Sequence, residues 1–506
     1  MTSQRPRLET RSGILEGRSE DGLAVFRGVP YAAPPVAARR WASPLREEAW
    51  AGVRDAGAIG ATAPQRASLV MRMLGLEGFA QDEDCLTLQV WTPATDGARR
   101  PVLVWLHGGG FTAGAGSLPL FDGATLARRG DAVVVTLNYR LGALGFLALP
   151  DLQDAGETGA NFGLLDQIAA LEWVRDHASL LGGDPDNVTL FGESAGAMSI
   201  GALLGAPTAR GLFHRAILQS GAAHNVSPRA NGLRVAELFR AALGQPDAPV
   251  EVLRTLPVDA ILAAQGQVID QSWRHVEGLA FQPTVDGAVL PRAARDAIAD
   301  GAARDVALLI GTNLDEWRLF ALTDPKLRTM DDAGLLRRLV RVPPEAAGDP
   351  EAFAQRAAQT YRSARRGAAI DPASLWLAMQ TDLVFRIPAL RVAVLQLRAT
   401  ANVHVYLCDW ASPALDGALG SCHGIELPFV FGTHRDPRAV QLVGSGPEAD
   451  RLATAMQDAW LAFARSGDPG WPAYDVAKRT TQRLGRECSV DFDPQGAERA
   501  FWDGLL

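Results

Sequence analysis

The sequence is poor in cysteine, in long apolar runs and in clustered basic residues, and each scarcity excludes a class of protein. Its four cysteines are too few and too scattered for a disulfide scaffold or a zinc site, and we expect reduced thiols packed as small apolar groups. No apolar stretch is long enough to span a bilayer. The first twenty residues, MTSQRPRLETRSGILEGRSE, lack the apolar core of a secretory signal, so we expect a cytoplasmic protein.

Positive charge is also in deficit, because 49 Lys and Arg stand against 57 Asp and Glu, for a formal net charge of -8. Such a chain repels nucleic acid and anionic membrane surfaces, and no basic stripe overrides the balance. We therefore expect no nucleic-acid or membrane partner, and a small neutral substrate instead. We expect no cofactor and no metal. The sequence does not specify the oligomeric state, for which a monomer is our working assumption.

What the chain does contain is a regular series of buried strands. With 506 residues and 47% hydrophobic content, it can bury a large core. Short apolar runs rich in β-branched residues recur between turn signals, and such continuous hydrophobicity is typical of parallel strands covered by helices on both faces. These runs cover residues 102–106, 132–137, 188–191, 216–219, 306–310 and 403–407.

Helices and a hairpin complete this pattern. Apolar residues repeat at helical spacing over 164–174, and again over 452–463, where we expect the helix that closes the chain. Near the N-terminus, apolar residues at 14–15 and 24–26 flank turn-forming residues at 20–22. This arrangement predicts an antiparallel hairpin joined to the larger sheet, which is then mixed.

Strand signals fade in two long segments, at about residues 225–300 and 324–386, where helical and charge-rich patterns predict insertions or a cap over the site. No internal repeat, low-complexity tract or Gly/Ser linker separates independent units. We therefore expect one α/β domain over residues 1–506, with a large mixed, mostly parallel sheet flanked by helices.

The first chemical motif is Gly192-Glu193-Ser194-Ala195-Gly196, which follows the strand at 188–191 and precedes an apolar, small-residue helix. This is the context of a nucleophile elbow, in which a strained turn exposes a serine and leaves no room for β-carbons beside it. The alternative is a glycine-rich helix cap whose serine bonds to backbone. The position of the motif after a buried strand favours the nucleophile.

A second motif, HGGGF at residues 107–111, follows another predicted strand. Consecutive glycines allow backbone N–H groups to turn toward a ligand. We expect an oxyanion hole formed by the N–H groups of Gly109, Gly110 and Ala195, the residue after the nucleophile. A flexible turn or a phosphate loop fits less well, because no Gly-Lys-Ser/Thr follows.

A serine nucleophile needs a histidine base, and in elbow hydrolases the order along the chain is serine, acid, histidine. Among the histidines after Ser194, His423 lies in a loop shortly after the strand at 403–407. His404 lies within that strand and is expected in the core. We expect His214 to be structural and His434 to be a solvated loop residue.

The acid is expected just past a strand as well, and both Asp315 and Glu316 follow the strand at 306–310. Their spacing alone does not choose between them. The glycine loop, serine, acid and histidine each fall at the C-terminal end of a different predicted parallel strand, the edge at which ligands bind in open α/β sheets. Ser220 reaches the same edge, either as a turn serine or as a support for the triad, and Glu193 is a further supporting candidate.

Taken together, the ordered motifs resemble the type-B carboxylesterase family, which includes liver carboxylesterases, cholinesterases and bacterial p-nitrobenzyl esterases. The likeness covers nearly the whole chain and also runs through the following segments: FRGVPYA at 26–32, EDCL at 83–86, NYRLG at 138–142, NFGLLDQ at 161–167, the 315–316 loop and HG at 423–424.

The resemblance implies the α/β-hydrolase fold and assigns the triad acid to Glu316. Trp317 stands where the family usually has glycine, so the geometry of the loop or the adjacent pocket wall is expected to differ. The family pairs the cysteine at the position of Cys85 with a cysteine before Pro-Gln, but Ala63 stands there, which fits a reduced cytoplasm.

These observations predict a carboxylic-ester hydrolase that acts through an acyl-enzyme on Ser194, with His423 as base and Glu316 as acid. Candidate pocket walls are aromatic and indicate apolar or aryl esters, although each could equally be a core residue: Phe111, Trp273, Trp317, Phe320 and Phe385. One alternative is hydrolysis of a carbamate or aryl amide by the same triad. Another is a non-catalytic binding protein on the fold, which the intact triad argues against.

Overall fold

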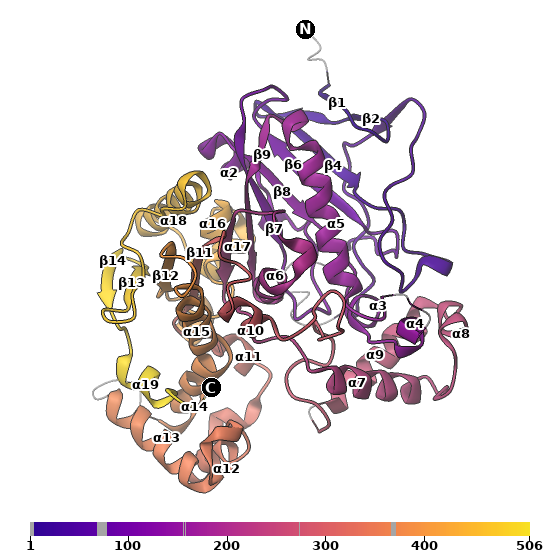
Figure 1. Ribbon diagram of the computed structural model, residues 1–506. Coiled ribbons are helices and arrows are strands. Elements are labelled where there is room, and N and C mark those ends of the chain that lie inside the picture. Colours follow the sequence, from indigo (N-terminus) through magenta and orange to yellow (C-terminus); the bar gives the residue numbers. More distant parts are fainter. Residues whose placement is uncertain are drawn as a thin grey trace.

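The computed structural model describes residues 5–67, 78–154, 156, 158–272, 274–365 and 371–505, and a long twisted sheet runs through its centre (Figure 1). The sheet has 11 strands. From edge to edge they are β14 (Ser489–Phe492), β13 (Thr480–Leu484), β12 (Val403–Cys408), β11 (Ala307–Asn313), β10 (Arg215–Gln219), β9 (Gly183–Glu193), β7 (Arg100–Leu106), β8 (Val133–Leu137), β6 (Thr87–Thr92), β4 (Leu23–Pro30) and β3 (Arg18–Glu20).

The middle of this sheet is parallel and its ends are antiparallel. Every neighbouring pair from β8 to β13 is parallel, whereas β14, β6, β4 and β3 pair in antiparallel fashion. All six strands predicted from apolar runs are present, as β7 to β12. The predicted mixed sheet is thereby confirmed.

The central strands are apolar on both faces because each face packs against its own hydrophobic core. Along β7, Val102 and Val104 belong to one core, while Leu103 and Trp105 point to the opposite one. This alternation follows from the two-residue period of a strand. It explains why these segments read as continuous hydrophobic runs in the sequence.

Helices cover both faces. On one face lie α5 (Phe162–His177), α6 (Ala195–Gly205), α10 (Ala294–Ala299) and α15 (Ile387–Gln396), and on the other α2 (Ala124–Gly130), α16 (Leu427–Phe431) and α18 (Pro447–Ser466). The shorter helices α3 (Gly142–Phe146), α4 (Pro150–Asp154) and α17 (Pro437–Val443) lie in the connections. The helix predicted over 164–174 is confirmed as α5.

The remaining helices gather at one end of the molecule, in two groups (Figure 1). One group is α7 (Arg229–Ala242), α8 (Val250–Arg254) and α9 (Val258–Ser272). The other is α11 (Arg318–Ala321), α12 (Asp332–Leu339), α13 (Pro350–Ala364), α14 (Pro372–Thr381) and α19 (Gly496–Phe501), of which α12, α13, α14 and α19 share a third core that includes Phe353 and Trp502. A π-helical turn, η7 (Asp382–Arg386), joins α14 to α15. In the described part of the chain, none of the helices has the length and apolarity that crossing a membrane requires.

One prediction about the chain ends is wrong, and another, the hairpin around residues 20–22, is confirmed except for its first strand. The helix α18 does not close the chain, because β13, β14 and α19 follow it. The hairpin forms between β3 and β4, while residues 14–15 belong to β2 (Ile14–Glu16) in a separate small sheet with β1 (Arg7–Glu9) and β5 (Val53–Asp55). Gly17 interrupts the run between β2 and β3, so the two segments join different sheets.

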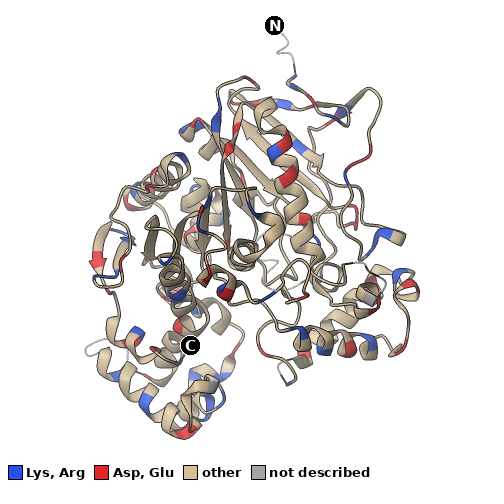
Figure 2. Ribbon diagram, in the orientation of Figure 1, with Lys and Arg blue, Asp and Glu red and all other residues tan. Residues whose placement is uncertain are grey.

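The positions of charged residues and cysteines match the layered fold, with charges mostly on the outer helices (Figure 2) and most cysteines buried. Figure 2 shows acidic and basic residues interspersed along the peripheral helices, while the central strands carry few of them. The cysteines Cys85, Cys408 and Cys422 are free and buried, as predicted for small apolar groups, but Cys488 is exposed. Burial raises the pKa of the Cys422 thiol to about 12, so that thiol stays protonated at neutral pH.

One buried ion pair ties two of the sequence motifs together. The guanidinium of Arg140 binds the carboxylate of Asp166 through Nε at 2.8 Å and Nη2 at 2.7 Å, and the backbone N–H of Arg140 donates to the same carboxylate at 3.0 Å. Both side chains are buried. The pair therefore fixes the start of α5 to the loop after β8.

We predict that Arg140→Met lowers the free energy of unfolding by about 3–5 kcal/mol, because it leaves the charge of Asp166 buried without a partner. Denaturant unfolding followed by circular dichroism measures the change. The matched control is Arg129→Met, which breaks the exposed pair of Arg129 and Asp458 and is expected to cost less than about 1 kcal/mol. Equal losses in the two variants would contradict the structural role of the buried pair.

Candidate active site

Ser194 occupies a sharp turn between β9 and α6. Its backbone is held at φ +53° and ψ −124°, outside the regions that a serine ordinarily adopts. The turn closes on itself so tightly that a β-carbon on Gly196 would lie 2.0 Å from the carbonyl oxygen of Leu106. The N–H of Ser194 donates to the carbonyl of Gln219 at 2.9 Å and anchors the turn to β10. This is the local geometry that the elbow motif predicts.

The glycine loop lies directly against this serine. A β-carbon on Gly108 would stand 3.1 Å from the β-carbon of Ser194. Gly109 and Gly110 adopt φ of +120° and +61°, which turns their peptide groups away from the direction of β7. Within the described residues, the N–H groups of Gly109, Gly110 and Ala195 have no hydrogen-bond acceptor. Three unpaired donors thus lie on the two segments that the sequence singled out, the glycine loop and the turn that carries Ser194.

His423 and Glu316 form a buried pair. The imidazole Nδ1 lies 2.6 Å from Glu316 Oε2, and the other carboxylate oxygen accepts the backbone N–H of Asn313 at 2.8 Å. The backbone N–H of His423 donates to the carbonyl of Glu316 at 3.4 Å. Both loops follow the C-terminal ends of neighbouring parallel strands, β11 and β12. The histidine is therefore fixed in orientation by the carboxylate.

The adjacent carboxylate, Asp315, points elsewhere. Its Oδ2 accepts the backbone N–H of Ser421 at 3.1 Å, and its Oδ1 lies 3.2 Å from Nε of Arg318. Glu316, by contrast, is completely buried. Of the two neighbours that spacing left open, the structure places Glu316 against the imidazole and uses Asp315 to hold the histidine loop.

The other imidazole nitrogen faces a second glutamate. His423 Nε2 lies 3.0 Å from Glu193 Oε1, but the angles at this contact are not those of a hydrogen bond. Among the described residues, no hydrogen bond joins Ser194 Oγ to His423 Nε2. Such contacts are often long in proteins without substrate and tighten when it binds. The serine and the imidazole thus share the site without forming their proton-transfer contact.

Three buried carboxyl groups surround the single imidazole. Burial raises the pKa of Glu193 to about 8. Burial works against the charge of His423, but Glu193 and Glu316 outweigh that cost and raise its pKa to about 9. The site therefore favours a positive charge on the imidazole.

The third carboxyl group, Glu426, was not assigned a role from the sequence. Burial raises its pKa, while its oxygens accept the side-chain N–H groups of Gln219 at 3.0 Å and Asn313 at 2.7 Å. These donors come from the ends of β10 and β11. Nothing in the residues around Glu426 distinguishes it from an ordinary first-turn glutamate of α16, so no local signal could have found it.

Ser220 lies at the same sheet edge but makes no side-chain contact with the triad. It is fully buried, its φ is +52°, and its N–H donates to the carbonyl of Gly311 at 2.9 Å. Its hydroxyl has no partner within the described part of the chain. No hydrogen bond from the Ser220 hydroxyl to the triad therefore supports the role considered for this residue. Glu193, by contrast, does contact the imidazole.

An aromatic cluster of Trp317, Phe320 and Phe385 covers His423. The ring centres of Phe320 and Phe385 lie 5.1 and 4.8 Å from the imidazole, and Trp317 packs on Phe320 at 4.9 Å. Trp317 has φ −71°, which any residue adopts, so its backbone does not require the glycine usual in the family. The departure therefore alters the pocket wall and not the turn.

Of the remaining candidates, Phe111 takes the core position that was its alternative, and His434 differs from expectation. Phe111 is fully buried and packs on Phe146 at 5.0 Å, so it belongs to the core, and Trp273 lies outside the described residues. His434 is not a solvated loop residue: it is buried, and its Nε2 lies 3.0 Å from Asp450. Its position next to α18 was not visible in the sequence.

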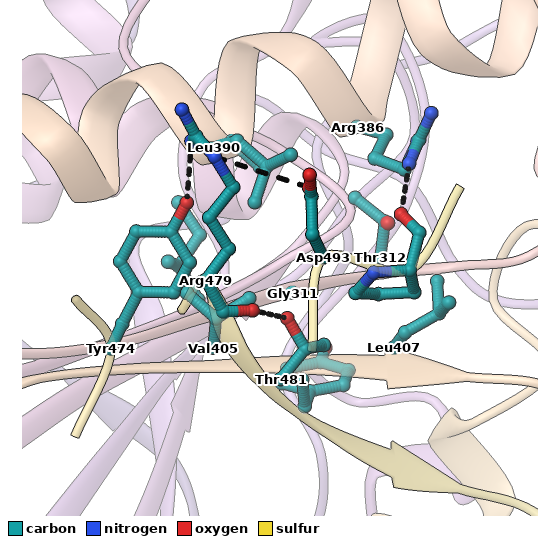
Figure 3. Close-up of a pocket in the computed structure, with 14 residues that line it drawn as sticks. Gly311, Thr312, Arg386, Leu390, Val405, Leu407, Tyr474, Arg479, Thr481 and Asp493 are labelled. Atoms are coloured by element: carbon teal, nitrogen blue, oxygen red, sulfur yellow. Dashed lines mark hydrogen bonds and ion pairs between the residues drawn. The ribbon is translucent and has the colours of Figure 1, made fainter. Parts of the chain in front are cut away.

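A separate cavity lies between the sheet and α15 (Figure 3). Its lining comes from β11, β12, α15 and the loop around Asp493. The side chain of Arg479 reaches across it to the hydroxyl of Tyr474 at 3.2 Å. Its free volume of about 20 Å³ leaves room for about one water molecule. This cavity is therefore too small to hold an ester substrate.

Comparison with known proteins identifies the family. The model of the carboxylesterase family matches residues 4–502. The chain is 39% identical over 503 residues to para-nitrobenzyl esterase of Bacillus subtilis (strain 168), with 97% of each chain covered, and 39% identical over 490 residues to phenmedipham hydrolase of Pseudarthrobacter oxydans, with 93% of each covered.

Solved structures agree with this assignment. The crystal structure of a carboxylesterase from Geobacillus stearothermophilus superposes with a TM-score of 0.86 at 38% identity, over 98% of this chain and 100% of the other. The family resemblance, the α/β-hydrolase fold and the carboxylic-ester hydrolase activity predicted from the sequence are confirmed. The chain belongs to the carboxylesterase family.

Proposed function

We propose that this protein hydrolyses small carboxylic esters through an acyl-enzyme on Ser194, with His423 as general base and Glu316 as the carboxylate that orients it. The observation that carries the proposal is the contact of 2.6 Å between His423 Nδ1 and Glu316 Oε2 at the sheet edge where the elbow presents Ser194. A serine hydroxyl attacks only when a neighbouring base accepts its proton. The buried imidazole is the base available there.

In the first half of the reaction, Ser194 Oγ bonds to the ester carbonyl carbon while its proton passes to His423 Nε2. The carbonyl oxygen becomes an oxyanion, which the N–H groups of Gly109, Gly110 and Ala195 stabilise. The bond to the alcohol oxygen then breaks, and the imidazolium returns its proton to the departing alcohol. In the second half, water attacks the acyl-serine with the same proton transfers, and the carboxylic acid leaves.

The buried carboxyl groups support the charge that appears during these steps. Each transfer to His423 creates an imidazolium, which Glu316 at Nδ1 and Glu193 near Nε2 both favour. Because the site is buried, these interactions are stronger than they would be in water. Glu193 is therefore proposed as an electrostatic partner of the base.

The aromatic cluster of Trp317, Phe320 and Phe385 supports apolar or aryl esters as the substrate class. A second candidate is a carbamate or aryl amide, since the relatives above are named for different substrates, para-nitrobenzyl esters in one case and phenmedipham in the other. Rates on an ester, a carbamate and an anilide with the same aryl group separate the two candidates. A carbamate rate above the ester rate would reverse the order proposed here.

We predict that Ser194→Ala lowers kcat for p-nitrophenyl acetate by about 10⁴- to 10⁶-fold, because no other group can form the acyl-enzyme. A spectrophotometric assay and labelling by a fluorophosphonate probe check the loss. Ser199→Ala, a buried serine one turn further along α6, serves as the control and keeps activity and labelling. Retention of wild-type turnover by Ser194→Ala would refute the acyl-enzyme.

The two adjacent carboxylates give a sharper test. Glu316→Gln is expected to lower kcat by about 10³- to 10⁴-fold, since an amide neither selects the right tautomer of His423 nor stabilises its charge. Asp315→Asn keeps one acceptor for the Ser421 N–H and is expected to retain kcat within about threefold. If the two variants lose activity equally, the role proposed for Glu316 is wrong.

Glu193 is expected to set the pH dependence. The base works only when neutral, so kcat/KM rises as pH increases through the pKa of His423, which the carboxylates hold above its usual value, at about 9. Glu193→Gln removes one of these charges, and the rise in kcat/KM is expected to move to lower pH. Profiles from pH 5 to 10 measure it, with Asp315→Asn as the unchanged control. A shift to higher pH would contradict the assigned contact.

A further inference from the structure

The glycine loop, Gly108–Gly116, must hold its free N–H groups in one direction to stabilise an oxyanion. Glycines alone do not provide this, because they are the most flexible residues in the unfolded and folded chain. The loop instead folds back on itself, and β-carbons on Gly109 and Gly114 would stand only 2.1 Å from the carbonyl oxygen of Ala113 and 2.3 Å from that of Gly108. Within the loop, the N–H groups of Thr112 and Ala113 donate to the carbonyl of Gly109 at 3.2 and 3.0 Å, and side chains outside the loop bind its returning half.

Gln65 contacts the returning half of the loop with both ends of its amide. Its Oε1 accepts the N–H of Gly114 at 2.8 Å, and its Nε2 donates to the carbonyl of Gly114 at 3.0 Å. The side chain is 3% exposed, and its Nε2 also donates to the carbonyl of Ala63 at 3.0 Å. One side chain thus pairs with both backbone polar groups of a single residue, as a residue of a neighbouring strand would.

Two further side-chain amides, those of Asn138 and Gln89, bind the backbone of Gly116. The N–H of Gly116 donates to Asn138 Oδ1 at 2.9 Å, and Gln89 Nε2 donates to the carbonyl of Gly116 at 3.1 Å. Both side chains are buried. Asn138 is in turn fixed by its Nδ2, which donates to the carbonyl of Ala61 at 3.0 Å. The returning half of the loop is therefore held by three amides, Gln65, Gln89 and Asn138, which we call the amide clamp.

The clamp is connected to the nucleophile through direct contacts. Gln65 binds Gly114, and a β-carbon on Gly114 would stand 2.3 Å from the carbonyl oxygen of Gly108, so the two glycines are packed together. Gly108 in turn lies against Ser194 and Glu193. Gln65 is thus linked to the nucleophile through Gly114 and Gly108, the residue that precedes Gly109 and Gly110.

We propose that the amide clamp, and Gln65 above all, is the positioning device of the oxyanion hole. Gln65 does not touch the substrate; it acts by holding the peptide planes of Gly109 and Gly110 in place before the transition state forms. The inference rests on the proposed function, since it assumes that these N–H groups receive the oxyanion. An amide suits this position because it carries a donor and an acceptor on two separate atoms, one for the carbonyl and one for the N–H of Gly114.

The test is Gln65→Met, which keeps the length of the side chain and removes both hydrogen bonds to Gly114. We expect kcat for p-nitrophenyl acetate to fall about tenfold or more, with KM changed less than about twofold, because small displacements of preorganised groups slow the chemical step. Affinity for an aryl trifluoromethyl ketone, whose adduct places an oxyanion in the hole, is expected to fall in parallel with kcat/KM.

The matched control is Gln396→Met. Gln396 is also a buried glutamine whose Nε2 donates to two backbone carbonyls, those of Ala303 and Val306, but it ends α15 and binds the segment that leads into the N-terminal end of β11. The Gln396→Met variant is expected to have a lower melting temperature with unchanged kcat and ketone affinity. If Gln65→Met does not fold, Gln89→Met takes its place. This variant removes one hydrogen bond to the loop, the bond to the carbonyl of Gly116, and is tested by the same measurements of kcat and ketone affinity.

The outcomes separate the two levels of the proposal. A Gln65→Met protein that is less stable but keeps kcat and ketone affinity would show that the clamp is only structural. A fall in kcat without a fall in ketone affinity would also overturn the proposal, because the effect would not pass through the oxyanion hole. Failure of the wild-type protein to label at Ser194 or to bind the ketone would instead contradict the proposed function itself.

Discussion

His423 is buried between Glu316 and Glu193, and this imidazole between carboxylates is the interaction around which the site is organised. A charge formed in such a place is costly unless partners are already arranged, since the surrounding protein cannot reorient as water does. The structure supplies those partners from several strands at once: Glu316 after β11, Glu193 at the end of β9, and Glu426 held by amides from β10 and β11. The chain segments that carry Glu193 and Glu316 are therefore both packed against the imidazole of His423.

The parallel sheet makes this convergence possible. In its register Leu106 of β7 pairs with Gly192 of β9, and Gln219 of β10 lies between Glu193 and Gly311. The loops that carry the glycines, the serine, the acid and the histidine thus leave the sheet at nearly one level. Side chains separated by hundreds of residues meet there because parallel strands deliver their C-terminal ends to one edge.

Several of the motifs that carried the family resemblance turn out to satisfy buried polar groups. Arg140 and Asp166 pair in the core, Asn138 and Gln65 hold the backbone of the glycine loop, and Asn161 donates to the carbonyl of Thr284 at 2.7 Å. Irregular backbone inside a protein needs such partners, because each unpaired N–H or carbonyl is costly. These motifs therefore satisfy the buried polar groups of irregular backbone next to the sheet.

The sequence by itself determined the central strands, the elbow at Ser194 and the glycine loop, because each depends on a local pattern of apolar residues and glycines. It could not choose between Asp315 and Glu316 without a relative, nor assign Glu426, the buried position of His434 or the pairing of β2. Those features depend on which chain segments meet in space. A carboxylate next to an imidazole and one next to a backbone N–H look identical in a sequence, and only the tertiary structure decides which partner each one has.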